Sequence, residues 1–495
     1  MIALDYPLWL RATHYLDVLF LSLLVRSGFE ILSAHPHFYW SDDCTPGSEW
    51  LAFSKKKQSG DQLHTADDEE RSFSSWIALP GRRHFDLGRH WHFLSVVGWL
   101  VTGLVYVAML LVTPEWRRLI PTSWHIVPDA GRVLLGYLHL HLMNTPGSYN
   151  ALQQLTYAAV VFVLAPLSIA TGVAMSPAVS ARFPWYIRMF HGRQGARSIH
   201  FLCLCGFTAF FVGHVTLVVL HGLPTGFARI VLGETEHPHL TRAVLVGLGG
   251  LAGIVLIHIL ATTVSFSHAR LVQRIIQTLI DPLRTALFGH QVSMQRYSTA
   301  DISPYHWVNG RPPKDENYLR LARDNFDSYS LEVGGLVSVP LRLTLAELRA
   351  MPIQTQITKH CCIQGWSGIA EWGGVPLRHI IELCGPLPSA RYVVFHAFDD
   401  KAMSEPRPKG AGFYYGTVRM QLAMHPQTIL AWRMNGRPLP IPHGAPLRLR
   451  LETQLGFKMV KYIRAIEFTA DYRSVGKGYG GWSEDNIYRS QEAGI

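Results

Sequence analysis

Five long apolar stretches dominate the first half of the chain. They cover roughly residues 9–32, 93–113, 152–175, 201–220 and 243–266. Each has about the 20 residues that a helix needs to cross a bilayer. A further apolar stretch, 131–143, is too short to span and is more typical of an interfacial or re-entrant helix. The pattern predicts a membrane domain of five helices over residues 1–266.

Polar residues fill the loop between the first two stretches, residues 36–89. Its segment KKKQSGDQLHTADDEE, residues 55–70, carries the densest charge, so we expect it to be the most solvated part of the loop. Past residue 266 the pattern changes to an amphipathic segment, ARLVQRIIQTLIDPLRTALFG. We assign residues 267–298 to an amphipathic linker that leads into a third region, residues 299–495.

The region 299–495 carries apolar or alternating runs of strand length between turn residues. These runs are YSLEVGGLV, YVVFHAF, APLRLRLE and IRAIEFTA. Short helices are predicted at PLRHIIELCG and TLAELRAM. The second begins with Thr344 and has Glu347 three residues later, the spacing of a capping box. The predicted fold class is a membrane α-helical bundle of five spans followed by a soluble mixed α/β domain with mostly antiparallel strands.

Composition agrees with a chain that is partly embedded in lipid. Of the 495 residues, 48% are hydrophobic and only 16% are charged, which is low for a purely soluble protein. The net charge of +10 does not indicate a nucleic-acid partner, because no basic block is interleaved with aromatic residues. Arginines at membrane borders account for the excess. The six cysteines lack the spacing of a disulfide framework.

Histidines stand inside several of the apolar stretches, where polar residues are costly and by default functional. His200 and His214 lie on the same stretch, close to four helical turns apart. They therefore share one helix face at two depths, separated by about 21 Å along the axis. Two such ligands suit two stacked hemes. Because alternate spans run in opposite directions, depth pairs His92 with His200 and His14 with His214, and His90 remains the alternative to His92.

The segments around these histidines resemble the diheme cytochrome b subunits of nickel-iron hydrogenases, formate dehydrogenases and thiosulfate reductases. The resemblance covers about residues 8–266, through RATHYLD, GRHWHF, YNALQQLTYAAVVFVLAPLSIATGVAMS, RSIHFL and FFVGHV. It implies two hemes b and a quinone or quinol that exchanges electrons near one of them. A fifth span departs from relatives that have four. The implied heme ligands are His14, His92, His200 and His214, whereas His139, His141, His221 and His258 have no partner at matching depth.

Two adjacent cysteines, Cys361 and Cys362, precede a glycine and a tryptophan in KHCCIQGWSG. Such a pair on its own is more often two small buried hydrophobes than a metal site. The longer stretch HCCIQGWSGIAEWGGVPLRHIIEL resembles the molybdenum-binding segment of the sulfite oxidase superfamily. The resemblance is closest to the bacterial branch that includes the catalytic subunit of the methionine-sulfoxide-reducing system. Counted back from Gly365 and Trp366, the family's cysteine falls on Cys362, a soft thiolate ligand for molybdenum.

A second segment, MHPQTILAWRMNGRPLPIPHGAPLRLRLETQLGFKMVKYIRAIEFT, resembles the family's cofactor-binding signature. Cationic side chains there suit the phosphate of molybdopterin, although lysines that merely solvate a strand edge are the alternative. DISPYHWVNGRPP adds two further candidates at the front of the domain. The implied cofactor-binding residues are Tyr305, His306, Arg448, Lys458, Met459, Val460 and Lys461.

The substrate pocket departs from that of the methionine-sulfoxide-reducing relatives. Ala397 and His443 stand where those relatives have threonine and asparagine. The arginine-rich anion pocket of sulfite oxidases is not recognisable either, which weakens sulfite as the substrate. The candidates for catalytic or pocket positions are Cys362, His360, His396, Arg407, Tyr415 and His443.

The two resemblances together imply a membrane-bound molybdenum oxidoreductase. It is expected to pass electrons between a molybdopterin site and the quinone pool through two b hemes while it exchanges an oxygen atom with a small sulfur-containing substrate. Sulfoxide reduction is slightly favoured. The alternatives are a dehydrogenase of sulfite or another reduced sulfur compound, a heme conduit with an inactive molybdopterin-like module, and a non-redox binding module on a membrane anchor. Expected partners are lipid, quinone and a small substrate, and a homo-oligomer stays open.

The expected location is the bacterial inner membrane. The first apolar run, of span length, has no basic region before it and no small-residue cleavage site, so we expect no cleavable signal peptide. No twin-arginine signal precedes an early apolar segment. Arginines near the spans are denser on the side of the C-terminal region, which favours a cytoplasmic molybdopterin domain. The orientation usual in the cytochrome b family favours the periplasm instead.

Overall fold

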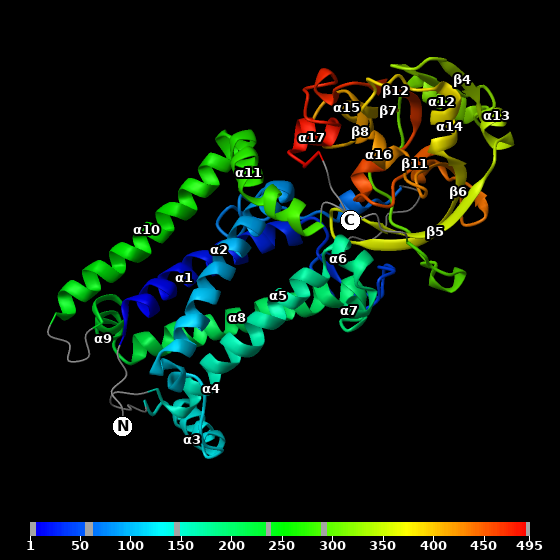
Figure 1. Ribbon diagram of the computed structural model, residues 1–495. Helices are drawn as coiled ribbons and strands as arrows, with labels where there is room; N and C mark the ends of the chain where they lie inside the picture. The colour runs from blue at the N-terminus through cyan, green and yellow to red at the C-terminus, as the bar shows by residue number, and fades with distance from the viewer. Residues whose placement is uncertain (1–5, 55–62, 143–148, 234–238, 289–294, 492–495) are drawn as a thin grey trace.

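Long helices form one part of the molecule, and a β-rich domain sits at one end of them (Figure 1). The computed structural model describes residues 6–54, 63–142, 149–233, 239–288 and 295–491. The helix α1 (Leu8–Leu32) begins at the end of the bundle that lies far from the β-rich domain. The chain crosses from one end of the bundle to the other several times before it enters the β-rich domain.

Four helical segments in the described part of the chain are long and apolar enough to cross a membrane. They are α2 (Phe85–Val112), the run Ala151–Ala174, α8 (Gly192–Leu220) and α10 (Leu240–Ser267). The run Ala151–Ala174 consists of α4 (Ala151–Ala159), η3 (Val160–Leu164) and α5 (Ala165–Ala174). These four correspond to four of the five predicted spans. The predicted span 9–32 forms α1, which packs along α2 but carries Arg11, Asp17, Arg26 and Glu30 and is not among the four.

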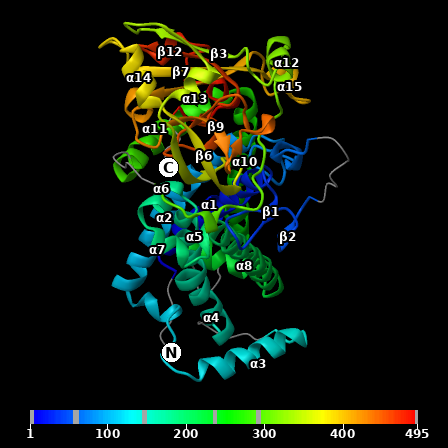
Figure 2. The ribbon, with the colours of Figure 1, turned by 90° about the vertical axis from the view of Figure 1, so that its right-hand side faces the viewer.

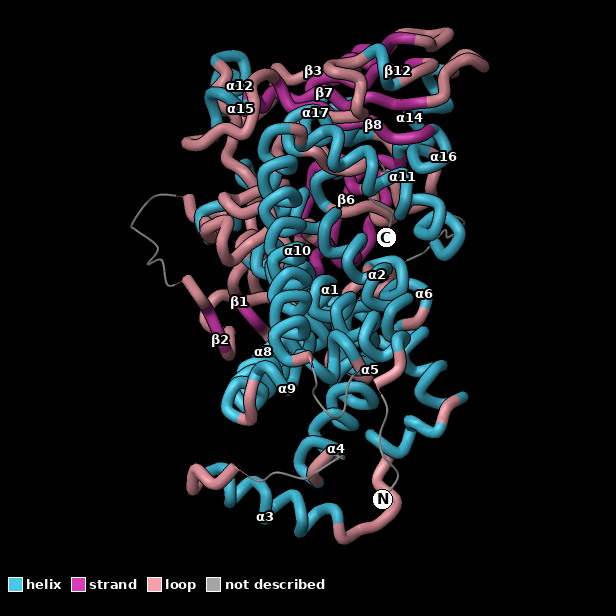
Figure 3. The backbone as a smooth tube through the Cα atoms, turned by 90° about the vertical axis from the view of Figure 1, so that its left-hand side faces the viewer, coloured by secondary structure: helices cyan, strands magenta, loops and turns pink. Residues whose placement is uncertain are grey.

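Shorter helices border the bundle. The predicted interfacial stretch 131–143 is represented by α3 (Ile126–Leu138), which lies across the far end of the bundle (Figures 2 and 3). The amphipathic segment after α10 forms α11 (Ala269–Phe288), which lies beside α2. The others are α6 (Pro177–Arg182), α7 (Pro184–Arg188), α9 (Leu223–Phe227) and η4 (Ala228–Leu232).

The β-rich domain holds two five-stranded sheets among the described residues. One has the order β10-β9-β6-β5, with β11 paired to β9, and the other has the order β4-β3-β12-β7-β8. Only β12 and β3 pair in parallel within these sheets as described. The strands of the first sheet are β5 (Gln354–Cys361), β6 (Ser367–Pro376), β9 (Ile429–Met434), β10 (Arg437–Pro438) and β11 (Arg448–Arg450). The others are β3 (Ser330–Gly335), β4 (Leu341–Thr344), β7 (Tyr392–Asp400), β8 (Phe413–Arg419) and β12 (Ile463–Thr469).

The predicted mixed α/β domain with mostly antiparallel strands is confirmed. Each of the four predicted strand segments contains a strand, namely β3, β7, β11 and β12. The predicted capping box is present at α13 (Leu345–Ala350): the Glu347 amide donates to Thr344 Oγ1 at 3.2 Å and the Thr344 amide donates to Glu347 Oε2 at 2.7 Å. The other helices are α12 (Glu316–Arg323), α14 (Leu377–Cys384), α15 (Lys401–Ser404), α16 (Met420–Ala423) and α17 (Trp482–Ile487).

The loop between α1 and α2 overturns one expectation. We call its described residues, 33–54 and 63–84, the α1–α2 connector; it contains β1 (His37–Phe38), β2 (Leu51–Ala52) and η1 (Ala66–Glu69). The charged segment 55–70 was expected to be solvated, but in its described part Thr65, Ala66 and Glu69 are at most 3% exposed. The reason is pairing: Glu69 contacts His37 at 3.0 Å and accepts from the Ser54 hydroxyl at 2.6 Å, and the Ala66 amide donates to the Val308 carbonyl at 2.8 Å. Residues 55–62 lie outside the described residues.

The connector joins the two halves of the molecule through a shared apolar core. Ala34, Tyr39, Cys44 and Ala66 of the connector, with Phe85 at the start of α2, are buried against the β-rich domain. Their partners in that domain are Trp307, Cys361, Cys362, Ile363, Trp366 and Leu455. The segment that carries the two adjacent cysteines is therefore packed directly against the helical domain.

Candidate functional site

Two pairs of histidines face each other within the helical bundle. The rings of His92 on α2 and His200 on α8 have centroids 6.5 Å apart. Those of His14 on α1 and His214 on α8 are 6.4 Å apart. A ring nitrogen binds a metal at about 2.0 Å, so a single iron between two imidazoles places their centroids roughly 6 Å apart. Each pair has the separation that one heme iron requires.

Hydrogen bonds orient three of these four imidazoles. In each case the Nδ1 atom has a partner at 3.0 Å, which leaves Nε2 as the free ring nitrogen. A metal-binding histidine is commonly held by its second nitrogen in this way. The partners are the Ser27 hydroxyl for His92, the Ser168 carbonyl for His200 and the Tyr157 hydroxyl for His214.

The remaining membrane histidines make other contacts. His90 lies with Nε2 3.2 Å from the Tyr488 carbonyl, so the structure places His92 and not His90 opposite His200. His258 contacts the Ser22 hydroxyl and the Arg26 guanidinium, each at 2.8 Å. These contacts are those of polar residues satisfied by neighbouring side chains.

Cys362 lines a cavity of about 330 Å³ between the β-rich domain and the α1–α2 connector. Its Sγ accepts hydrogen bonds from the Gln364 amide at 3.4 Å and from Asn309 Nδ2 at 3.3 Å. Burial raises the pKa of this thiol to about 11, and the two hydrogen bonds oppose that rise. A bound metal would deprotonate it. Cys361 is the last residue of β5, is buried and is not among the residues that line the cavity.

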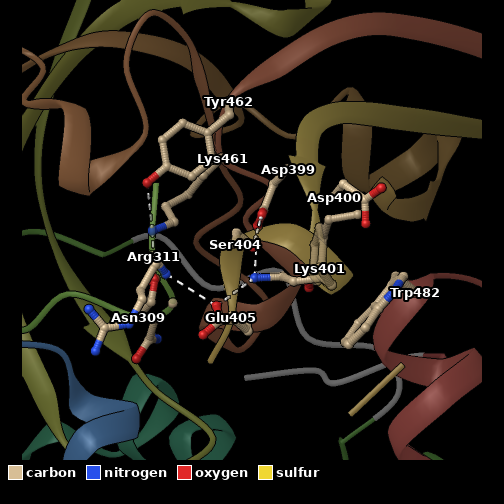
Figure 4. Close-up of polar contacts among 12 residues, drawn as sticks. Asn309, Arg311, Asp399, Asp400, Lys401, Ser404, Glu405, Lys461, Tyr462 and Trp482 are labelled. Carbon is tan, nitrogen blue, oxygen red and sulfur yellow. Dashed lines mark hydrogen bonds and ion pairs between the residues drawn. The ribbon is translucent and has the colours of Figure 1, made fainter. Parts of the chain in front are cut away.

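Two cations, the buried Arg448 and the half-buried Lys461, line the same cavity. Lys461 Nζ donates to the carbonyl oxygens of Asn309 and Pro442, at 2.5 and 3.0 Å, and to the Tyr462 hydroxyl at 3.3 Å (Figure 4). All three are neutral oxygens. Burial and the nearby Arg448 lower the pKa of Lys461 to about 7, and burial and Arg450 lower that of Arg448 to about 9.

This cationic pair fits an anionic cofactor group. Arg448 Nε is buried with no hydrogen-bond partner among the described residues. A phosphate placed there would accept from both side chains and would raise their pKa values, because an opposite charge favours the charged form. Arg448, Lys461 and Cys362 are therefore suited to hold the phosphate and the metal of molybdopterin, respectively.

The other sequence-predicted cofactor residues divide into two groups. Met459 lines the cavity with Arg448 and Lys461. Lys458 instead forms a buried ion pair with Glu484, and Val460 is buried in the core of the domain, so neither lines the cavity as described. Tyr305 packs edge-on against Trp307, with ring centroids 5.4 Å apart.

Three predicted histidines gather in a second, much smaller cavity beside the first. His306, His360 and His443 line it together with Arg448 and Lys461. The ring centroids of His360 and of His443 both lie 5.4 Å from that of His306. Burial, followed by Arg448 and Lys461, lowers the pKa of His443 to about 3, so its imidazole is neutral at physiological pH. These histidines flank the cation pair and do not line the cavity that holds Cys362.

The remaining pocket candidates lie at the rim of the cavity or outside it. Arg407 is exposed and lines the cavity. His396 pairs with Glu467 at 2.9 Å, and Tyr415 donates to Asp485. Neither of these two is among the lining residues.

Sequence reasoning missed the connector as a wall of the site. Gln364, two residues after Cys362, donates through Nε2 to Asp67 Oδ1 at 2.7 Å and to Glu70 Oε1 at 3.2 Å. Arg83 also lines the cavity and pairs with Glu70. The only available signal was the acidity of ADDEE, which is equally typical of a solvated loop.

Replacing Lys461 by methionine is expected to lower the molybdenum content of the purified protein by about tenfold or more, because a charge-assisted hydrogen bond contributes about 1.5–3 kcal/mol. The affinity of the unchanged protein for the molybdenum cofactor should fall about tenfold per pH unit above 7. The reason is that the neutral Lys461 amine must gain a proton when the cofactor phosphate binds. Metal analysis after gel filtration at several pH values measures both effects. The exposed Lys477→Met is the control; equal retention in both variants contradicts the assignment.

Two family models match separate regions of the chain. The family model described as prokaryotic cytochrome b561 matches residues 5–233. The model described as oxidoreductase molybdopterin binding domain matches residues 318–475. The first match contains all four paired histidines, and the second contains Cys362, Arg448 and Lys461.

Individual relatives match about a third of the chain. A putative protein-methionine-sulfoxide reductase subunit YedZ1 from Azospira oryzae is 40% identical over 161 residues, 32% of this chain and 54% of the relative. The protein-methionine-sulfoxide reductase catalytic subunit MsrP from Campylobacter jejuni is 32% identical over 151 residues, 30% of this chain and 51% of the relative. The chain thus spans about half the length of the curated relatives that it matches.

One solved structure is also similar over part of its length. The sulfane dehydrogenase SoxCD from Paracoccus pantotrophus covers 31% of this chain and 42% of its own, with 22% identity and a TM-score of 0.26. The assignment depends on the two family models and the curated relatives. The chain joins a region that matches the cytochrome b561 model, and that contains several helices long and apolar enough to cross a membrane, to a region that matches the molybdopterin-binding oxidoreductase model.

Proposed function

We propose that this protein reduces small sulfoxides with electrons drawn from the quinone pool through two b hemes. The observation that carries the proposal is the arrangement of α8. One end of this helix contacts the turn that holds Cys362, and His200 and His214 follow along it, each opposite a partner histidine. Electrons that enter near His214 would move along α8 from the heme between His14 and His214 to the heme between His92 and His200. From there they would reach the molybdopterin site.

The candidate residues would bind three groups: the two hemes, the molybdenum and the cofactor phosphate. His14 with His214, and His92 with His200, would hold the hemes. Cys362 would supply the thiolate ligand, while Arg448 and Lys461 neutralise the cofactor phosphate. Bound molybdopterin supplies two-electron oxygen-atom transfer. Reduction of a sulfoxide consumes two electrons and two protons and yields a sulfide and water, which is the stoichiometry that oxidation of one quinol provides.

The walls of the cavity support a small substrate. Cys362 is only 2% exposed, and the α1–α2 connector covers its turn through the bonds of Gln364 to Asp67 and Glu70. Glu70 also pairs with Lys409 at 3.3 Å, which ties the connector to the far side of the opening. A cavity of about 330 Å³ must hold both cofactor and substrate. To enter the cavity, a methionine sulfoxide side chain on a folded protein would have to displace the connector. A small free sulfoxide would not.

The proposed location is the bacterial inner membrane with the molybdopterin domain on the cytoplasmic side. The arginines near the end of the bundle that carries this domain support that side, because positive residues accumulate at the cytoplasmic border. Protease digestion of vesicles of either orientation, followed by detection of the C-terminal domain, tests the assignment.

Purified protein with its hemes reduced by a quinol is expected to be reoxidised by dimethyl sulfoxide or free methionine sulfoxide. An oxidised folded protein that presents methionine sulfoxide on its surface should be reduced at least about tenfold more slowly than the free sulfoxides. The reason is that its binding would break the contacts between the connector and the rest of the cavity wall. Stopped-flow spectroscopy of the heme bands measures both rates. Faster turnover of the protein-bound sulfoxide contradicts the small substrate, and reduction of oxidised hemes by sulfite would favour a dehydrogenase.

A further inference from the structure

Two side chains at the start of α8 form hydrogen bonds with the turn that holds Cys362. Gln194 Nε2 donates to the Gly365 carbonyl at 2.9 Å and to the Ser367 hydroxyl at 3.0 Å. Arg193 Nη1 donates to the carbonyls of Gly365 and Trp366, at 3.2 and 3.3 Å. Gln194 is fully buried and Arg193 is 7% exposed. These bonds join two domains whose partner residues are about 170 positions apart in sequence.

The turn itself connects these bonds to the metal ligand. The Cys362 amide donates to the Trp366 carbonyl at 3.0 Å, and the Gly365 amide donates to the Cys362 carbonyl at 3.2 Å. The Trp366 carbonyl is therefore shared by Cys362 and Arg193. Gly365 has a φ of +116°, which side chains other than that of glycine rarely adopt. This conformation turns the Gly365 and Trp366 carbonyls toward α8.

The same face of α8 leads from this contact to the heme ligand. Arg193, Arg197 and His200 stand at positions i, i+4 and i+7, so they form one stripe along the helix. At 1.5 Å per residue, Arg193 and His200 are separated by about 10 Å along the axis. Arg197 Nη1 donates to the His37 carbonyl at 2.6 Å, which holds the connector against this stripe.

Asp42 of the connector forms a second link between the cysteine turn and α8. Asp42 of the connector accepts from the Gln194 amide at 2.8 Å and forms an ion pair with Lys359 of β5. Lys359 is 6% exposed, so this ion pair is largely shielded from water. The cysteine turn is thus held from both sides, and its distance from His200 is set by buried hydrogen bonds.

We propose that Arg193 and Gln194 are the bridge that couples the Cys362 turn electronically to the heme held by His92 and His200. This inference depends on the proposed function. The bridge would carry one electron at a time, two for each sulfoxide reduced, from a heme held by His92 and His200 to a molybdenum centre held by Cys362, and no bond would form or break in the bridge itself. One path of the bridge passes from Cys362 through the Trp366 carbonyl and the Arg193 guanidinium to the backbone of α8. A second path passes from the Cys362 carbonyl through Gly365 to the Gln194 side chain. Arg193 and Gln194 are positioning residues because neither touches the substrate.

The test uses the full chain loaded with both hemes and molybdenum. Arg193→Met and Gln194→Met remove the donors but keep length and apolar volume, and Arg193→Lys keeps one donor. Reduced protein is mixed with dimethyl sulfoxide, and reoxidation of the heme bands is followed by stopped flow. In parallel, sulfoxide reduction is measured with reduced benzyl viologen, which donates directly to the molybdopterin domain. The exposed Arg188→Met, on α7 at the same end of the bundle, is the matched control.

We expect heme reoxidation to slow by about tenfold in both methionine variants, because steps that depend on positioning lose up to ~100-fold for a displacement of about 1 Å. Viologen-linked activity and both heme spectra should stay unchanged, and Arg193→Lys should restore most of the rate. If the methionine variants do not accumulate, Ser367→Ala removes one acceptor of Gln194 with less disturbance and should slow the same step.

Three results would overturn the bridge. Heme reoxidation could be unchanged in both methionine variants, or in Ser367→Ala where those do not accumulate. Both activities could fall in parallel, which would indicate a purely structural contact. A heme spectrum could be lost, which would indicate a role in holding the heme. Failure of the proposed function looks different: the hemes of the unchanged protein would not be reoxidised by any sulfoxide.

Discussion

Cys362→Ser is expected to abolish sulfoxide reduction with both quinol and viologen donors while both heme spectra remain intact. Replacing a residue that only orients a metal ligand costs about 10–100-fold in affinity or activity, so loss of the ligand itself should cost more than ~100-fold. Cys362 lines the cavity, and its Sγ accepts from Gln364 and Asn309. A serine hydroxyl is a harder and far less acidic ligand than a thiol.

The neighbouring cysteine is the matched control for this experiment. Cys361 is also buried, at 4% exposed, but it pairs with Ser367 across β5 and β6 and does not line the cavity as described. Cys361→Ser should therefore retain most of the activity and bind molybdenum normally. If Cys361→Ser were inactive and Cys362→Ser active, the register derived from Gly365 and Trp366 would be wrong by one residue.

His214→Ala is expected to remove one of the two hemes and to lower quinol-linked turnover by more than ~100-fold, since losing an axial ligand disrupts the site more than losing a partner of the ligand does. Activity with reduced viologen should persist, because the molybdopterin domain and the His92–His200 pair are untouched. The 6.4 Å separation of the His14 and His214 rings motivates this expectation. Heme content, redox titration and the two activities measured side by side separate the effects.

His221→Ala, on the residue that directly follows α8, is the matched control for the second experiment. Its Nδ1 lies 2.8 Å from the Leu217 carbonyl, and its ring packs edge-on against Tyr137. It should keep two hemes and nearly full quinol-linked activity. Two hemes in His214→Ala, with retained quinol activity, would be evidence against the pairing.

Much of this molecule follows from local sequence pattern. Helical periodicity placed His200 and His214 on one face, and the alternating direction of the spans paired them with His92 and His14 at the depths where the structure now places them. The capping box of Thr344 and Glu347 was readable because it depends on residues three positions apart. Alternating runs likewise predicted β3, β7 and β12.

Some candidate residues could not be sorted by their sequence. Lys458 and Lys461 stand three residues apart in one motif, yet Lys461 faces the cavity and Lys458 is paired with the buried Glu484. Their different surroundings arise from a short 3₁₀ turn, η7 (Gly456–Lys458), and from the distant α17. His360 and His443 similarly lie beside the cation pair in the smaller cavity because β5 and the segment before β11 meet there.

By itself the sequence determined the two-part architecture, the two histidine pairs and the position of the cysteine motif, because helix period, strand alternation and motif spacing are properties of neighbouring residues. Only the tertiary structure decided that the acidic part of the connector forms a wall of the cavity, since Asp67 meets Gln364 across 297 positions of sequence. The same holds for Arg193 and Gln194, whose side chains meet the cysteine turn across about 170 positions. Local pattern shows that such groups are polar, but their buried partners are set by the packing of the two domains.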